Sequence, residues 1–123
     1  RMESNLKWRI KSYKDNECFK TLIAVMKLFK EYSDLEGFRP VVAVLPYKND
    51  VLYARESSPY YNDFIDACDN ILPTIDLMQN FMNLEDLDKY FSDNTKYGGH
   101  YSKHGNILVA KVIFDRLKKE GAL

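Results

Sequence analysis

Residues 38–46 have the sequence Phe-Arg-Pro-Val-Val-Ala-Val-Leu-Pro, and the apolar run within this stretch decides the fold class. A short continuous run of mostly β-branched residues, without polar alternation, is typical of a strand covered on both faces, as in parallel sheets. Pro46 ends the run. An amphipathic helix precedes it and a polar segment follows it, so the stretch predicts an αβ unit. In open α/β sheets, the loops at the carboxyl ends of strands are where ligands bind.

The rest of the chain continues this alternation. Apolar residues recur at helical spacing after Asp15 or Asn16, either of which can cap a helix, and Gly37 ends the pattern. The second strand candidate contains Pro73, which favours the start or the edge of a strand. Residues 1–14 show no clean period and are expected to be a lead-in segment. The remaining expected elements are a polar loop at 47–58, a helix at 59–68, a strand at 71–77, a short helical or irregular connection at 78–91, a polar loop at 92–106 and a helix at 107–119.

The composition limits the class of protein. The chain has 123 residues, of which 46% are hydrophobic, and this suits a single domain spanning residues 1–123. Its 18 basic and 18 acidic residues cancel and are interspersed, which argues against a nucleic-acid or anionic-membrane partner. We expect no transmembrane span and no signal peptide in these residues. The cellular compartment stays open.

The cysteines and histidines do not form a recognisable metal or redox motif. Cys18 and Cys68 are far apart, and each lies in an apolar helical pattern, so we expect two buried structural thiols and no disulfide. His100 and His104 have the spacing of two zinc ligands on a helix. Glycines interrupt that helix and no third ligand is close by, so we expect neither a metal nor any other cofactor.

The most informative segment is residues 97–106, with the sequence Tyr-Gly-Gly-His-Tyr-Ser-Lys-His-Gly-Asn. Paired glycines allow positive φ angles and close backbone approach, which helps to present an imidazole at a cleft. Histidine titrates near neutral pH, so the ring of His100 could accept and return a proton during acyl transfer. Ser102 is a candidate cap for the last helix. The alternative is an ordinary solvated histidine in a loop.

This segment resembles the final sequence block of SGNH (GDSL-like) serine hydrolases, in which a catalytic histidine precedes a polar turn, a glycine and an amphipathic helix. The layout from Asp15 onward follows the second half of that fold. The resemblance implies part of a three-layer α/β/α sandwich with a mostly parallel, flavodoxin-like sheet. The chain would then be the C-terminal portion of a larger hydrolase domain of the bacterial type.

The resemblance assigns the general base to His100. The family's orienting aspartate, two or three residues before the histidine, is replaced here by Tyr97 and Gly98. Asp93 is the nearest substitute, and Asp76 or a backbone carbonyl are the other options. None of the seven serines follows a Gly-Asp pair, so the nucleophile is expected outside these residues. The weaker candidates for lining the substrate cleft are Tyr47, Asn49 and Asp50, and the favoured alternative is that they are ordinary loop residues.

Two functions therefore follow from the sequence. The first is one half of a serine hydrolase that cleaves or transfers ester-linked acyl groups on a small-molecule, glycan or lipid substrate. The second is a non-catalytic α/β binding or interaction module that keeps this architecture but lacks the carboxylate that would orient the histidine. In both cases an exposed strand edge predicts docking on the missing half of the domain, or self-association.

Overall fold

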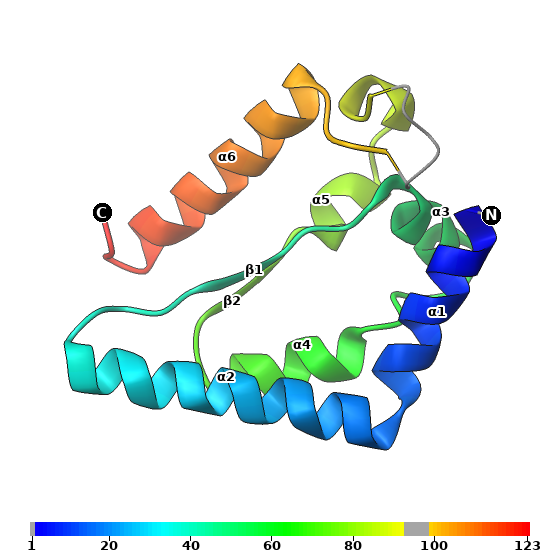
Figure 1. The fold of residues 1–123 in the computed structure, drawn as a ribbon. Coiled ribbons are helices and arrows are strands. Elements are labelled where there is room, and N and C mark those ends of the chain that lie inside the picture. Colours follow the sequence, from blue (N-terminus) through cyan, green and yellow to red (C-terminus); the bar gives the residue numbers. More distant parts are fainter. Residues whose placement is uncertain (1, 93–98) are drawn as a thin grey trace.

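The chain is mostly helical, with a small parallel sheet (Figure 1). The computed structural model describes residues 2–92 and 99–123. Its elements in chain order are α1 (Met2–Lys14), α2 (Asn16–Glu36), β1 (Val42–Val44), α3 (Lys48–Glu56), α4 (Asn62–Asp69), β2 (Thr74–Asp76), α5 (Met78–Met82), the 3₁₀ helix η1 (Leu87–Tyr90) and α6 (Lys103–Lys119). The α/β class predicted from the sequence is confirmed.

The sheet consists of β1 and β2, which pair in parallel with Val42 opposite Thr74 and Val44 opposite Asp76. Both carboxyl ends therefore lie at the same edge of the sheet. Within the described residues no other strand joins this pair, and the residues of β1 are only half-buried. The expectation that this strand is covered on both faces is wrong for this chain, because two strands and their helices are too few to enclose it.

The long helix α2 forms as the sequence predicts. The Asp15 carboxylate accepts a hydrogen bond from the backbone N–H of Cys18 at 2.9 Å, which caps the helix. Gly37 ends it with a φ of 77°, a left-handed conformation that glycine adopts without strain. The inner face of α2 packs on the core through Phe19, Leu22, Ile23, Met26 and Phe29.

Two segments expected to be irregular are helices. Residues 2–14 form α1, and residues 48–56 of the expected polar loop form α3. The Asp50 carboxylate accepts a hydrogen bond from the backbone N–H of Tyr47 at 2.8 Å, which supports the first turn of α3. Charged residues obscure the apolar period in both segments, and only the contacts with the rest of the chain show which side of each helix faces inward.

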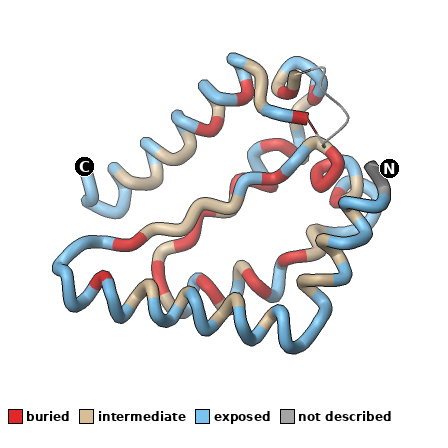
Figure 2. Tube along the Cα trace, viewed as in Figure 1, coloured by how far each residue is buried: buried red, intermediate tan, exposed pale blue. Residues whose placement is uncertain are grey.

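The buried side chains cluster around β2, α3, α4 and α5 (Figure 2). Cys68 belongs to this core, as predicted, but Cys18 is exposed near the start of α2, so the expectation that it is buried is wrong. Its helical position faces away from the core, which the apolar pattern alone did not reveal. Among the described residues, no helix combines the length and apolar character needed to cross a membrane.

The last helix begins earlier than expected, at Lys103 instead of Ile107. Ser102 caps it by accepting a hydrogen bond from the backbone N–H of Gly105 at 3.2 Å, which confirms the predicted cap. His104 is exposed within this helix and His100 precedes it, so the two histidines do not share a helical face. A Cβ atom on Gly105 would lie 2.1 Å from the Tyr90 carbonyl oxygen, so α6 packs against η1 at a point where only glycine fits.

We therefore expect Gly105→Ala to destabilise the chain, although glycine-to-alanine changes inside helices usually stabilise by about 1 kcal/mol. The clash is with backbone and cannot be relieved by a side-chain movement, and a cost of roughly 1–3 kcal/mol is typical of such overpacking. Urea unfolding followed by circular dichroism measures the change. Asn106→Ala, at the exposed neighbouring position, is the matched control and should be neutral. Equal stability of the Gly105→Ala variant and the parent chain would contradict this packing.

Candidate functional site

The backbone of His100 is held in a short antiparallel ribbon. Phe91 and Tyr101 form an isolated bridge, and the flanking hydrogen bonds run from the Ser92 N–H to the His100 carbonyl at 2.7 Å and from the Ser102 N–H to the Tyr90 carbonyl at 3.0 Å. The His100 side chain is exposed. The ribbon therefore fixes the backbone of the histidine and leaves its ring accessible.

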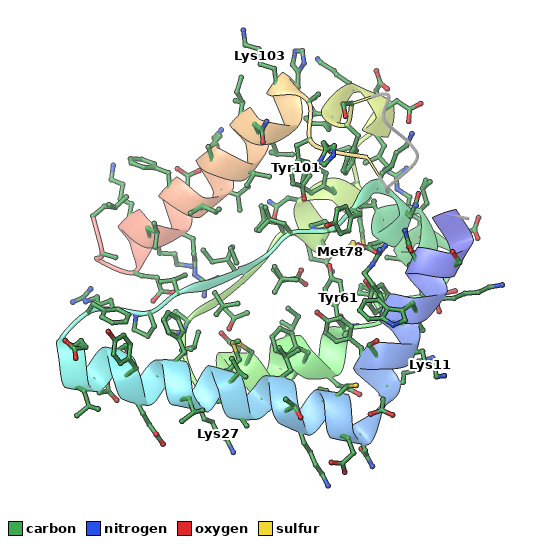
Figure 3. The ribbon with its side chains drawn as sticks, in the orientation of Figure 1. Lys11, Lys27, Tyr61, Met78, Tyr101 and Lys103 are labelled. Atoms are coloured by element: carbon green, nitrogen blue, oxygen red, sulfur yellow. The ribbon has the colours of Figure 1, made fainter. Side chains whose placement is uncertain are left out.

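Tyr101 fastens this ribbon to the end of the sheet. Its hydroxyl donates a hydrogen bond to the carbonyl oxygen of Pro46 at 2.6 Å, two residues past the end of β1. Its ring stacks on Phe81 with centroids 5.4 Å apart, and Figure 3 shows Tyr101 beside α5. Gly99, with a φ of 80°, lies close enough to Lys48 that an added Cβ would be 3.8 Å from the Lys48 Cβ. The backbone beside His100 is thus anchored at the carboxyl end of β1 and the start of α3.

The three residues predicted to line the cleft lie beside this anchor but differ in their accessibility. Tyr47 is 45% exposed, whereas Asn49 and Asp50 are buried. One Asp50 oxygen accepts hydrogen bonds from Arg9 at 2.8 Å and from the Tyr60 hydroxyl at 3.0 Å. The other accepts the Tyr47 N–H that caps α3. The carboxylate of Asp50 therefore joins α1, α3 and the start of α4, and its acceptor positions are taken up by the protein.

Arg9 is the other half of this buried ion pair. Its guanidinium also lies 4.9 Å from the centroid of the Tyr47 ring, in a cation–π contact. Burial acts to lower the pKa of Arg9, but the hydrogen bonds to Asp50 and Tyr60 outweigh it and raise the pKa above its ordinary value. Burial, followed by the nearby Asp50 carboxylate, raises the pKa of Tyr60. Arg9 therefore stays a cation and Tyr60 a neutral phenol at physiological pH.

Tyr61 places a second phenol next to this cluster. It is buried, and its hydroxyl has no hydrogen-bond partner among the described residues. Burial raises the pKa of Tyr61, with a further contribution from Asp76. Figure 3 shows Tyr61 at the start of α4, near α1. A neutral donor is thus held inside the molecule near the carboxyl end of β2.

Of the two carboxylates predicted to orient the His100 ring, the structure describes only Asp76. Asp93 lies outside the described residues. Asp76 is the last residue of β2, half-buried, and one of its oxygens accepts the Met78 N–H at 3.0 Å. Burial raises the pKa of Asp76. Within residues 2–92 and 99–123 no carboxylate forms an ion pair with His100, and no group of three potential metal ligands is present.

No family model, curated protein or solved structure matches the chain. The resemblance of the His100 segment to the SGNH block therefore stays a prediction. Function is inferred from the placement of the residues themselves.

Sequence reasoning missed three residues that build this site. Arg9 was hidden in a segment without periodicity, and Tyr101 gave no sign that its hydroxyl reaches the Pro46 carbonyl, 55 residues earlier. Ser92 lies directly opposite His100 in the ribbon, so both side chains project from the same face. The one available signal was the pair of aromatic residues, Phe91 and Tyr101, that flank the glycine-bearing loop.

If Asp50 is structural, its removal should cost stability. We expect Asp50→Asn to destabilise the chain by about 2–4 kcal/mol, because the change leaves the cation of Arg9 partly buried without its partner. A double-mutant cycle with Arg9→Met, measured by urea unfolding, should give a coupling energy above about 1 kcal/mol. Additive effects of the two substitutions would show that the ion pair does not hold α1 to α3.

The anchor of the ribbon can be tested in the same way. Tyr101→Phe keeps the ring stack and removes only the hydrogen bond to Pro46, so we expect a loss of about 1 kcal/mol. Hydrogen exchange should speed up at the backbone N–H groups of Ser92 and Ser102. Tyr32→Phe, at an exposed tyrosine, is the control and should change neither quantity. Unchanged exchange in Tyr101→Phe would mean that the ribbon is held by other contacts.

Proposed function

We propose that this chain is the C-terminal part of an SGNH-type serine hydrolase domain, with His100 as its general base. The observation that carries the proposal is the exposed imidazole on a ribbon that Tyr101 ties to the carboxyl end of a parallel strand. Catalytic groups of α/β enzymes are presented at that edge of the sheet. A solvated loop histidine would need neither the ribbon nor the buried anchor.

The chemistry proposed for His100 is proton transfer. The neutral ring accepts the proton of a serine hydroxyl as the serine oxygen attacks the carbonyl carbon of an ester. The resulting imidazolium then protonates the departing alkoxide, which leaves an acyl-enzyme. Water, deprotonated by the same ring, then attacks the carbonyl carbon of the acyl-enzyme. The imidazolium returns the proton to the departing serine oxygen, and the acid is released. This cycle needs no metal or other cofactor.

The serine comes from a segment outside these residues in this proposal. Ser92 projects from the same face as His100, but its N–H is already donated to the His100 carbonyl. An effective nucleophile sits on a sharp turn whose neighbouring N–H groups stay free to bind an oxyanion. Ser102 is equally unsuitable, because its hydroxyl donates to the Lys89 carbonyl at 2.6 Å and caps α6.

The fold supports the larger assembly that this function requires. The parallel pair lies between α2 and α6 in Figure 1, which suits one portion of a three-layer α/β/α sandwich. Among the described residues β1 pairs with β2 alone, so its other edge is available to further strands. Docking of the other half of the domain on this edge would complete the sheet and bring a serine to the strand ends.

The substrate site of this proposal lies at the carboxyl ends of the two strands. Tyr47 and Asn49 are its candidate lining residues, whereas Asp50 positions Tyr47 and the start of α3. Asp93 and Asp76 remain the candidates for orienting the His100 ring. The chemistry suits an ester of a small molecule, a glycan or a lipid.

A non-catalytic binding module is the second candidate. The observation that favours it is that, in the part of the chain described, His100 has no carboxylate partner, although a carboxylate normally holds the correct tautomer. In such a module, residues 99–102 would serve only to fasten η1 and α6 to the sheet.

The two candidates are separated by measuring hydrolysis of a short-chain p-nitrophenyl ester by the full-length protein. We expect His100→Ala to lower kcat by roughly 10³-fold or more, while the circular dichroism spectrum and thermal stability stay unchanged. His104→Ala, on the exposed face of α6, is the matched control and should retain full activity. A fluorophosphonate should label a serine outside this chain.

Full activity in His100→Ala would overturn the hydrolase proposal. The absence of both ester hydrolysis and a labelled serine in the full-length protein would establish the binding module instead. Labelling of Ser92 would leave the base in place and show that the nucleophile belongs to this chain.

A further inference from the structure

Two adjoining hollows lie where the end of α1 meets the start of α4, at the corner between α1 and α2 in Figure 1. The larger has a volume of about 330 Å³ and the smaller about 270 Å³. Lys14, Tyr60 and Asp63 line both hollows, so these three residues form the boundary between them. We call the two hollows together the α1–α4 groove.

The walls of the groove are rich in tyrosine. Tyr13 and Tyr61 line the larger hollow with Tyr60, and Tyr53 lines the smaller one with Tyr60. The Tyr60 ring meets the other three edge-on, with centroids 5.4 Å from Tyr13, 5.1 Å from Tyr61 and 6.2 Å from Tyr53. The aromatic side chains of the groove therefore form one connected set.

The central ring of this set is fixed in place. The Tyr60 hydroxyl donates to Asp50 at 3.0 Å and accepts from Arg9 at 3.2 Å, inside the molecule. Tyr60 nevertheless stays half-buried, because part of its ring faces the groove. A ring held in this way loses little conformational entropy when a ligand stacks on it.

Tyr61 adds a polar group that the chain leaves unsatisfied. Its side chain is almost completely buried in the wall of the larger hollow, and its hydroxyl has no hydrogen-bond partner among the described residues. A buried hydroxyl without a partner costs about 1–3 kcal/mol. One hydrogen bond beside the groove is therefore left for a molecule from outside this chain.

The rim of the groove carries polar side chains with unused hydrogen-bonding capacity. Asn16, Ser58 and Asn62 are exposed, and their side chains bond to nothing in the part of the chain that the structure describes. Lys14 and Asp63 line both hollows, yet within residues 2–92 and 99–123 neither forms an ion pair. Apolar walls with a few convergent polar groups are typical of a small-molecule site.

The charges of the rim indicate the class of ligand. An anion drawn to Lys14 would be repelled by Asp63, and a cation would meet the opposite pair of forces, so a neutral molecule fits best. Lysine donates hydrogen bonds, a carboxylate accepts them and the asparagine amides do both. Hydroxyl groups match such a rim because each one donates and accepts. The C–H groups on the face of a sugar ring suit the negative face of an aromatic ring.

We propose that the α1–α4 groove binds a neutral oligosaccharide, with one sugar ring in each hollow. The link between the two rings lies beside Lys14, Tyr60 and Asp63, which the hollows share. Both volumes are near the lower end of the roughly 300–1,000 Å³ of small-molecule pockets, which suits a single ring in each. The stacking surfaces are Tyr60 and Tyr53, and the rim binds the hydroxyl groups.

The groove adjoins the candidate site at the strand ends. Asp50, which accepts the Tyr60 hydroxyl, also accepts the backbone N–H of Tyr47. A sugar on Tyr60 is therefore one side chain away from the start of α3. The binding does not depend on the proposed hydrolase activity, because it suits an ester-bearing glycan of a hydrolase and the ligand of a non-catalytic module equally.

Titration of the full-length protein, followed by backbone amide NMR signals, tests the class of ligand. The neutral probes are the β-1,4-linked tetramers of glucose and of N-acetylglucosamine, and the acidic probe is a galacturonic acid tetramer. We expect saturable binding of a neutral tetramer, with a Kd of roughly 0.1–10 mM for such an open groove and shifts at residues 14, 58, 62 and 63. The acidic tetramer should bind at least about fivefold more weakly.

Two results of this titration would overturn the proposal. One is the absence of saturable binding for both neutral tetramers up to about 20 mM. The other is tighter binding of the acidic tetramer, which would make the groove an anion site.

Tyr53 tests the stacking without disturbing the fold, because it lies outside the hydrophobic core cluster. Tyr53→Ala should weaken binding of the neutral tetramer at least about fivefold, whereas Tyr53→Phe keeps the ring and should bind like the parent protein. Tyr32→Ala, at an exposed tyrosine of α2, is the matched control. Unchanged binding in Tyr53→Ala would contradict the proposed stacking.

The rim is tested by removing its charges one at a time. Lys14→Met and Asp63→Asn should each weaken binding of the neutral tetramer about threefold or more, and Asp63→Asn should also improve binding of the acidic one. Lys11→Met and Asp66→Asn, exposed on the same two helices, are the matched controls and should change neither. His100→Ala should bind sugar like the parent protein, so a failed test of ester hydrolysis stays separate from this one. Sugar binding that no groove variant weakens would place the site elsewhere and overturn the proposal.

Discussion

The parallel pairing of β1 with β2 is the constraint on which the rest of this structure depends. Parallel strands need a crossover connection, and here α3 and α4 provide it. The pairing of Val44 with Asp76 brings both carboxyl ends to one edge. Tyr47 and the His100 ribbon lie beside that edge because the segments following the two strands begin there.

Two sets of polar contacts hold the residues at the carboxyl ends of the strands in place. Asp50 binds Arg9, Tyr60 and the first turn of α3, so one carboxylate fixes the relative positions of three helices. Tyr101 reaches the carbonyl of Pro46 and carries the ribbon of His100 with it. Both contacts are partly buried, and a hydrogen bond broken there costs more than it would on the surface. The exposed imidazole therefore rests on a rigid support.

The small sheet leaves a strand edge unused. Among the described residues β1 pairs with β2 alone, so the other edge of β1 has no strand partner there. The residues of β1 are half-buried. Unpaired backbone groups at such an edge form a template for a further strand.

The sequence by itself determined the elements whose signals are local. These are the strand around residues 42–44, the capped helix that precedes it and the cap at Ser102, because apolar period and capping act within a few residues. Only the tertiary structure decided that residues 48–56 are helical, that Cys18 faces solvent, and that Asp50 is occupied by Arg9. The partners of these groups lie far away in the chain: Arg9 and Asp50 are 41 residues apart. A local sequence pattern does not indicate which distant side chain will contact a given residue.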